Sequence, residues 1–205
     1  MNILNISSSI YSADGQSSQL ASQFVSALRE REPGVRVAER DLARETLPHL
    51  DAARFQAFLT KPEERTAEQR AIAGDSDALI QELREADVVV LGLPMYNFGV
   101  PSSLKAYFDH IARAGVTFRY TASGSEGLLT GKRVVVFATR GGLHVGQASD
   151  SQTGFIRTFL GFLGLTDVDF VYAEGLARGE EQRTNALARA HAAITHLTEA
   201  EAIAA

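Results

Sequence analysis

The most informative part of the chain reads Val88-Val89-Val90-Leu91-Gly92-Leu93-Pro94-Met95-Tyr96-Asn97-Phe98-Gly99. Its first half is continuously apolar, which is typical of a central parallel strand that helices cover on both faces. The loop that follows combines a rigid proline with two aromatic rings and an asparagine. Such a loop offers an apolar platform, and amide groups beside it, to a flat ring system. The alternative is that Tyr96 and Phe98 are ordinary core aromatics.

On both sides of this stretch, strand-like and helix-like segments alternate, which predicts an α/β fold. The expected strands are residues 3–7, 35–42, 88–93, 134–139 and 168–173. Residues 35–42 mix apolar and charged side chains, as an exposed edge strand does. We therefore expect a doubly wound, five-stranded parallel sheet of strand order 2-1-3-4-5, with helices on both faces.

Helical periodicity fills the intervals. Leu20, Phe24, Val25 and Leu28 predict a helix that ends near residue 33, and Pro101 suits the first position of another. Residues 43–85 predict two helices with an irregular connection, and residues 116–129 a hairpin or an irregular excursion. The helix over residues 151–164 is apolar nearly all round, so it is either deeply buried or packed against a partner subunit. A final helix is expected over residues 180–202.

Composition bounds the function. A chain of 205 residues with 45% hydrophobic and 22% charged residues predicts one globular domain, residues 1–205. Its net charge of -5 and lack of a basic stripe argue against nucleic-acid binding. There is no cysteine, which excludes thiolate metal sites and disulfides, and no apolar run approaches the ~18 residues of a membrane span. We expect a cytoplasmic protein that binds neither membrane nor metal.

The loop after the first strand is rich in serine. Six serines and Gly15 lie between Ser7 and Ser18, directly before the first helix. Hydroxyls and the free amides of a helix start can hold a phosphate without a cation, and the first basic residue along the chain is Arg29. The alternative is that Ser17 or Ser18 is only a helix N-cap.

A third loop, Thr139-Arg140-Gly141-Gly142, follows the fourth expected strand. Two glycines allow backbone amides to approach a ligand closely, although Gly-Gly is also a common turn. Ligands of such sheets bind beyond the carboxyl ends of the strands, so the three loops are expected to form one site. His144, in the same loop, is the one histidine with a candidate functional role. No zinc spacing and no nucleophile elbow is present.

Five motifs resemble those of a known family. They are Met95-Tyr96-Asn97-Phe98, Pro101-Ser102-x-Leu104-Lys105, Gly115-Val116-Thr117-Phe118-Arg119-Tyr120-Thr121, Thr139-Arg140-Gly141-Gly142 and Phe159-Leu160-Gly161-Phe162-Leu163-Gly164. Together they resemble the bacterial FMN-dependent NADH:quinone oxidoreductases and NADH-azoreductases. The resemblance runs from the first strand to about Gly175. It implies a flavodoxin-like fold, a homodimer, bound FMN, and NADH or NADPH as electron donor.

The resemblance also implies roles for individual residues. Ser9, Gly15, Gln16 and Ser17 would bind the phosphate, Met95, Tyr96, Asn97 and Phe98 the ring, and Thr139, Arg140, Gly141 and Gly142 its carbonyl and N1 edge. The substrate side would be lined by Asn97, Phe98, His144, Tyr120 and Phe162, the last two in the partner's site. Three departures stand out: Gly15 and Thr139, where serine is frequent, and Ser125, where proline is common. A weaker hold on FMN and a changed acceptor preference are the expected consequences.

The resulting hypothesis is a two-electron oxidoreductase that reduces quinones and azo compounds by ping-pong hydride transfer. The alternative is a flavodoxin-type one-electron carrier. A phosphoacceptor signalling domain of the same fold is excluded, because it needs an aspartate at the end of the third strand, where this chain has Pro94 and Met95. The sequence leaves the physiological acceptor open. It also leaves open the choice of NADH or NADPH, for which Arg119 or Arg140 could meet a 2′-phosphate.

Overall fold

The computed structural model describes the backbone of residues 1–204 and the side chains of residues 1–199. Five parallel strands form one sheet in the order β2-β1-β3-β6-β7, which is the predicted order 2-1-3-4-5 when the sheet strands alone are counted. The strands are β1 (Asn2–Ser7), β2 (Arg36–Asp41), β3 (Val88–Pro94), β6 (Arg133–Thr139) and β7 (Asp167–Ala173). The predicted fold class is confirmed, and β2 is the half-exposed edge strand that its alternating sequence indicates.

The strand register brings the carboxyl ends of β1, β3 and β6 to the same edge of the sheet. Ser7 of β1 pairs with Gly92 of β3, and Pro94 of β3 pairs with Thr139 of β6. Every residue of β3 is buried, as its continuous apolar sequence requires. Because these strands are adjacent, the three loops that follow them emerge side by side.

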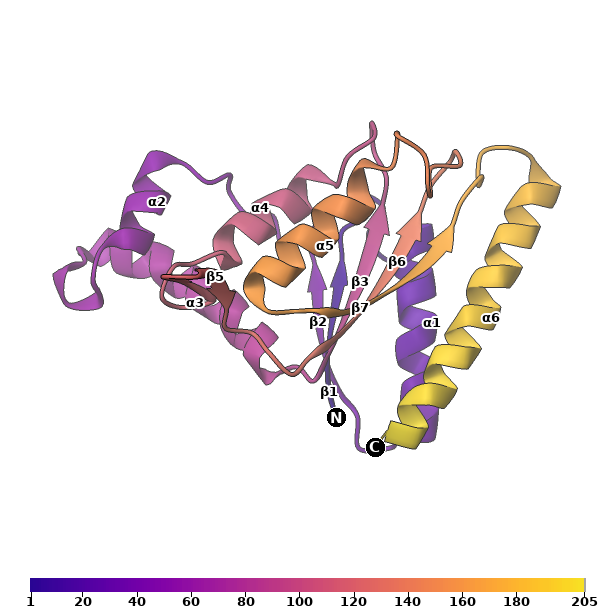
Figure 1. Ribbon diagram of the computed structural model, residues 1–205, viewed down its shortest axis with the longest axis horizontal. Coiled ribbons are helices and arrows are strands. Elements are labelled where there is room, and N and C mark those ends of the chain that lie inside the picture. The colour runs from indigo at the N-terminus through magenta and orange to yellow at the C-terminus, as the bar shows by residue number, and fades with distance from the viewer. Residues whose placement is uncertain (205) are drawn as a thin grey trace.

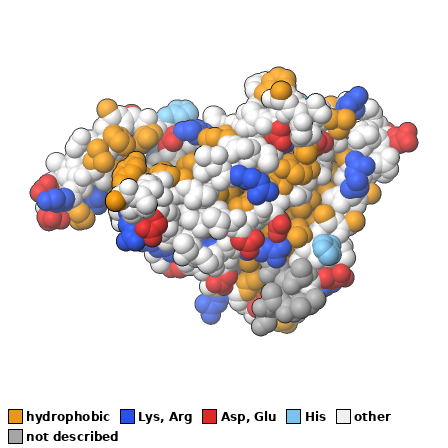
Figure 2. All heavy atoms as spheres, in the orientation of Figure 1, with side chains coloured by type: hydrophobic (Ala, Val, Ile, Leu, Met, Phe, Trp, Pro, Cys, Tyr) orange, Lys and Arg blue, Asp and Glu red, His pale blue; other side chains and the backbone are white. Residues whose placement is uncertain are grey.

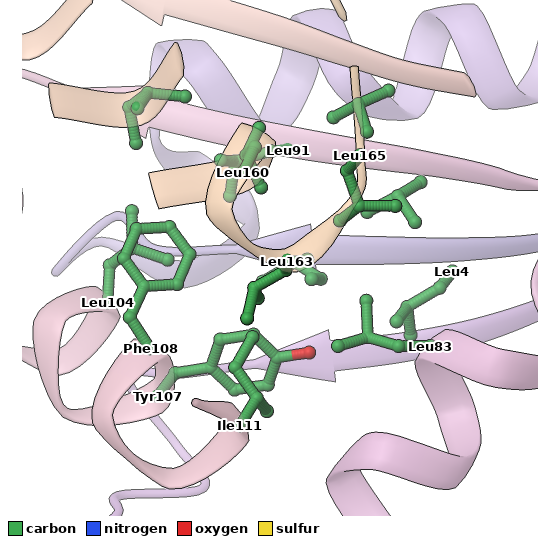
Figure 3. Close-up of a cluster of buried hydrophobic side chains, with 14 of the residues drawn as sticks. Leu4, Leu83, Leu91, Leu104, Tyr107, Phe108, Ile111, Leu160, Leu163 and Leu165 are labelled. Carbon is green, nitrogen blue, oxygen red and sulfur yellow. The ribbon is translucent and has the colours of Figure 1, made fainter. Parts of the chain in front are cut away.

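Helices cover both faces of the sheet, as Figure 1 shows. The α-helices are α1 (Gln16–Arg31), α2 (Ala52–Leu59), α3 (Ala67–Glu85), α4 (Ser102–Ile111), α5 (Ser151–Leu163) and α6 (Glu180–Ala204). One core includes Phe24 of α1, Val90 of β3 and Ile194 of α6. The other joins the opposite sheet face to α3, α4 and α5, and Figure 3 shows Tyr107 and Phe108 of α4 among its leucines. The predicted helix start at Pro101 is one residue early, because Pro101 has an extended ψ of 139° and is the N-cap.

Residues 43–85 form two helices with an irregular connection, as predicted. The connection includes a short 3-10 helix, η2 (Pro62–Glu64), and α3 begins with a capping box made by Thr66 and Gln69. The buried Arg113 holds α2 to this unit, because its guanidinium lies 4.9 Å from the Phe58 ring centroid and 2.7 Å from Asp77 Oδ1. Residues 43–85 are therefore packed against the rest of the fold.

The predicted hairpin consists of β4 (Phe118–Thr121) and β5 (Gly124–Gly127), and it packs on the end of α5. Only glycine fits at position 127, since a Cβ there would lie 2.0 Å from Gly164 N. Helix α5 buries Ile156, Leu160 and Leu163 but leaves three phenylalanines, Phe155, Phe159 and Phe162, half-exposed. Figure 2 shows hydrophobic side chains gathered over α2 and the tip of the neighbouring hairpin.

Candidate functional site

The three predicted loops meet in one groove at the carboxyl edge of the sheet. The groove encloses about 190 Å³. It is lined by Ser9, Tyr11, Gly15, Gln16, Pro94, Met95, Tyr96, Thr139, Arg140, Gly141 and Leu176. Eight of these eleven lining residues belong to the cofactor set expected from the sequence, whereas Tyr11, Pro94 and Leu176 do not. The expected convergence of the loops is therefore present.

The start of α1, whose first residue Gln16 lines the groove, has the chemistry of a phosphate site. The hydroxyls of Ser17 and Ser18 are buried in the first turn of α1, and neither has a hydrogen-bond partner among the described residues. In the same part of the structure, the amides of Gln16, Ser17 and Ser18 find no acceptor either, since the first helical bond runs from Gln19 N to Gly15 O. Unpaired buried hydroxyls are costly. Together with the positive end of the helix dipole, they suit an anion.

The structure gives a physical reason for the glycine at position 15. A Cβ at that position would lie 2.1 Å from Ser9 Oγ, so the Ser9 hydroxyl occupies the space that a side chain would need. Ser9 Oγ accepts a hydrogen bond from Tyr11 N at 3.2 Å and lies 3.3 Å from the Tyr96 hydroxyl. Position 15 therefore has no hydroxyl of its own, and the hydroxyl of Ser9 lies where a serine side chain at that position would be.

The second loop is a tight hairpin turn with backbone strain. Tyr96 N donates to Gly99 O, and Gly99 N donates back to Tyr96 O at 2.9 Å. The two residues between them, Asn97 and Phe98, have φ values of 49° and 61°. Such values are uncommon for residues other than glycine and cost about 1–3 kcal/mol each. Something must hold this turn in place.

The buried Gln152 at the start of α5 holds the turn. Its Nε2 donates to Pro94 O and to Gly99 O, both at 2.9 Å, which fastens the two ends of the loop. Ser151 Oγ donates to Phe98 O at the tip. The Tyr96 hydroxyl, which lies 3.3 Å from both Ser9 Oγ and Ile10 N, ties the second loop to the first. The loop therefore presents Asn97 and Phe98 to solvent in a fixed geometry.

The third loop leaves two backbone donors free. Gly141 and Gly142 use their carbonyls to accept from Ala177 N and Gly175 N, but their own amides have no acceptor in the described part of the chain. The fourth strand-end loop, which follows β7, thus fastens the third and places Leu176 against the groove. Sequence reasoning missed Leu176, although Gly175 and its position directly after a strand were available signals.

Arg140 lines the groove, but its guanidinium is turned into a buried cluster. It donates to Glu174 Oε1 and Asp150 Oδ1, each at 2.9 Å, and to Gln152 Oε1 at 3.3 Å. The side chain is fully buried, and its guanidinium lies over the Tyr172 ring. The suggestion that Arg140 meets a 2′-phosphate is therefore wrong, because its charge is already matched by two carboxylates. Arg119 is also committed, to an exposed pair with Glu126.

His144 lies beside the groove and next to the second loop. Its Nδ1 is 2.9 Å from Ser149 Oγ, and its ring meets the Phe98 ring edge-on at 5.7 Å between centroids. A second histidine, His49, lines an adjoining apolar pocket with Phe98 and Phe155, a place that sequence reasoning did not assign to it. His144 thus lies beside the exposed tip of the second loop.

Tyr120 and Phe162 lie away from the groove, around Phe118 on the hairpin. The Phe118 ring is 4.2 Å from the Phe162 ring and 5.5 Å from the Tyr120 ring, and 77% of Tyr120 is exposed. Neither residue lines the groove of their own chain. Within the described residues there is no cluster of acidic side chains and histidines that could hold a metal ion, and no helix long and apolar enough to cross a membrane.

The groove thus has an anion-binding end, a rigid apolar loop and free amides, and these residues fit a flavin mononucleotide. Comparison with known proteins agrees. A family model described as the flavodoxin-like fold matches residues 1–197, so the chain has a flavodoxin-like fold. It is 59% identical over 192 residues to an FMN-dependent NADH:quinone oxidoreductase of Burkholderia thailandensis, a match that covers 94% of this chain and 97% of the relative. The chain belongs to the family of FMN-dependent NADH:quinone oxidoreductases.

Other relatives support the same placement. An FMN-dependent NADH:quinone oxidoreductase of Cellvibrio japonicus is 52% identical over 187 residues, covering 91% of this chain and 94% of its own. Among solved structures, an FMN-dependent NADH-azoreductase of Bacillus anthracis in complex with FMN superposes with a TM-score of 0.85 at 26% identity, over 97% of this chain and 100% of the other. An azoreductase from the Sterne strain of that organism gives a TM-score of 0.88 at 25% identity, covering 97% and 99%.

Proposed function

We propose that this chain is an FMN-dependent NAD(P)H oxidoreductase that reduces quinones and azo compounds by two-electron transfer. The observation that carries the proposal is that one groove joins Gly15 and Gln16, which directly precede the unsatisfied hydroxyls of Ser17 and Ser18, to Met95 and Tyr96 of the rigid second loop. The first suits a phosphate and the second a flat ring. The family's FMN dependence and its NADH:quinone activity support the same assignment.

The residues are assigned to parts of the cofactor as follows. Ser9, Gly15, Gln16 and Ser17 bind the phosphate, Met95 to Phe98 support the ring, and Thr139 to Gly142 meet its carbonyl and N1 edge. FMN, when bound, supplies the site that accepts a hydride and passes it on. The free amides of Gly141 and Gly142 are suited to stabilising negative charge at the N1 edge.

The exposure of the second loop bears on how substrates reach the ring. Asn97 and Phe98 of the second loop are exposed, so a ring held against this loop would keep its other face open to solvent. NAD(P)H and the acceptor would then use that face in turn, each lying flat on it. His144, or water, would supply the proton that the reduced acceptor needs.

We also propose that residues 1–205 form one domain and that two copies form a homodimer. The half-exposed phenylalanines of α5, with Phe55, Phe98 and Tyr120 more than half exposed, present more apolar surface than an isolated chain needs. A two-fold interface would bury this surface and bring Tyr120 and Phe162 toward the partner's groove. The cytoplasmic location and the absence of nucleic-acid, membrane and metal partners stay predictions from the sequence.

An anaerobic titration tests the proposed activity. The purified protein should be yellow with about one FMN per chain, and one equivalent of NADH or NADPH should bleach the flavin absorbance fully. Adding one equivalent of a benzoquinone should restore the colour, because the transfer involves two electrons. The one-electron carrier alternative has no support among the relatives, and it predicts that NAD(P)H, which gives up two electrons as a hydride, does not bleach the flavin directly. Extracted cofactor that runs as FAD, or flavin that neither nucleotide bleaches, would overturn the proposal.

A further inference from the structure

One cation lies beside the phosphate end of the groove, although sequence position gave no sign of it. Arg183, in the first turn of α6, donates from Nη2 to Gln16 Oε1 at 2.8 Å. Gln16 is the first residue of α1 and lines the groove with Ser9 and Gly15. Helices α1 and α6 lie side by side on the same face of the sheet (Figure 1). The guanidinium thus lies at the end of the serine loop, although Arg183 and Gln16 are 167 residues apart in the sequence.

Arg183 differs from Arg140 and Arg31 in the group that it pairs with. Arg140 has two carboxylate partners, and Arg31, on α1, pairs with Glu199 of α6. Arg183 is half-buried, and among the described residues it has no carboxylate within ion-pair distance. A neutral carbonyl acceptor leaves the charge of a guanidinium uncompensated and most of its donors available. The acidic residues nearest to it in sequence, Glu180 and Glu181, are exposed.

We propose that Arg183 is a phosphate-recognising residue of the cofactor site. It adds positive charge to an anion site otherwise built from hydroxyls, amides and a helix dipole, and it holds the Gln16 side chain at the mouth of that site. The planar, permanently charged guanidinium is well suited to a phosphate dianion. Arg183 thereby favours FMN over riboflavin, which has the same ring but no phosphate. This inference rests on the proposed position of the phosphate.

The test measures the affinity of the apoprotein for FMN and for riboflavin by quenching of flavin fluorescence. Arg183→Gln removes the charge but keeps a donor for Gln16. It should raise the Kd for FMN roughly tenfold, on the scale of one charge-assisted hydrogen bond, and leave the Kd for riboflavin within about twofold. Arg183→Lys keeps the charge and should stay within about threefold of the wild type for FMN. Arg189→Gln, on the exposed side of the same helix, is the matched control and should change neither Kd.

Three results would overturn the inference: an unchanged FMN affinity in Arg183→Gln, an equal loss for FMN and riboflavin, or an equal FMN loss in the lysine and glutamine variants. An equal loss for both flavins would mean that Arg183 only fastens α6 to α1. The salt dependence gives a second reading, because raising the salt concentration should weaken FMN binding less in Arg183→Gln than in the wild type. A wild-type apoprotein that binds no FMN would instead refute the proposed site itself.

Discussion

Replacing Arg140 with methionine should lower the free energy of unfolding at pH 7 by roughly 3–5 kcal/mol, the cost of stranding buried charge. The fully buried guanidinium is the counter-charge for Asp150 and Glu174, and its loss leaves both carboxylates in a desolvated cluster. Because Gln152 connects this cluster to the second loop, the variant should also release FMN readily. Urea denaturation of the apoprotein and of the FMN-loaded protein measures the two effects separately.

The destabilisation should depend on pH. Burial raises the pKa of Asp150, but hydrogen bonds from Thr153 and Arg140, with the Arg140 charge, outweigh it, so the pKa in the folded protein lies below its usual value. A carboxylate with a depressed pKa contributes stability above its unfolded pKa of about 3.9, and that contribution is lost as the pH falls through the folded pKa. Without Arg140, the pKa of Asp150 should be higher than in the wild type, because the hydrogen bond and the charge of Arg140 both lower it. The difference between variant and wild type should therefore be largest at neutral pH and shrink below about pH 4.

Arg119→Met is the matched control for Arg140→Met. It removes an arginine from an ion pair with Glu126 in which both side chains are exposed, and such pairs contribute little to stability. The double variant Arg140→Met, Glu174→Gln should recover part of the lost stability, since one of the stranded charges is gone. A loss in Arg140→Met no larger than in Arg119→Met would contradict the structural role given to the cluster.

Phe162→Glu should convert the protein from dimer to monomer and reduce kcat/KM for quinones at least about a hundredfold. Phe162 is half-exposed in the single chain and lies with Phe118 and Tyr120 at the surface expected to reach the partner's groove. A buried carboxylate without a partner in an apolar interface costs several kcal/mol. Light scattering gives the mass, and steady-state assays give the turnover.

Two matched variants separate the interface effect from others. Phe162→Leu keeps an apolar side chain and should remain dimeric, whereas Ala192→Glu adds the same charge on the exposed side of α6 and should change neither mass nor rate. Circular dichroism checks that the glutamate variant is folded. A folded Phe162→Glu protein that is still dimeric and fully active would refute the proposed interface.

Most of the fold could be predicted from local sequence patterns. The continuously apolar run Val88–Pro94 suits a central strand, which is covered on both faces. The mixed apolar and charged run Arg36–Asp41 suits a half-exposed edge strand. The order of the sheet then places the three loops together, which is why most residues of the groove could be named in advance. The start of α4 was placed one residue early because Pro101 suits both the first helical position and the residue before it.

The remaining site residues depend on contacts between distant segments, which periodicity does not encode. In the sequence, Gln152 is simply a polar residue in an apolar helix. Only the folded structure shows that its side chain donates hydrogen bonds to both ends of the second loop. Arg183 lies 167 residues from Gln16, so its place at the serine loop follows from the packing of α6 on α1. The need for Gly15 likewise appears only when Ser9 is seen to fill the neighbouring space.

The central claim is that NAD(P)H and the acceptor use the same open side of a ring supported by the second loop. The most direct test is the initial rate at several fixed concentrations of quinone while NAD(P)H is varied. Two substrates that cannot be bound together give ping-pong kinetics, so we expect parallel lines in double-reciprocal plots. Tyr120→Ala should leave the lines parallel while changing the relative kcat/KM values of different acceptors. Intersecting lines would show a complex with both substrates bound, and the single shared face would be contradicted.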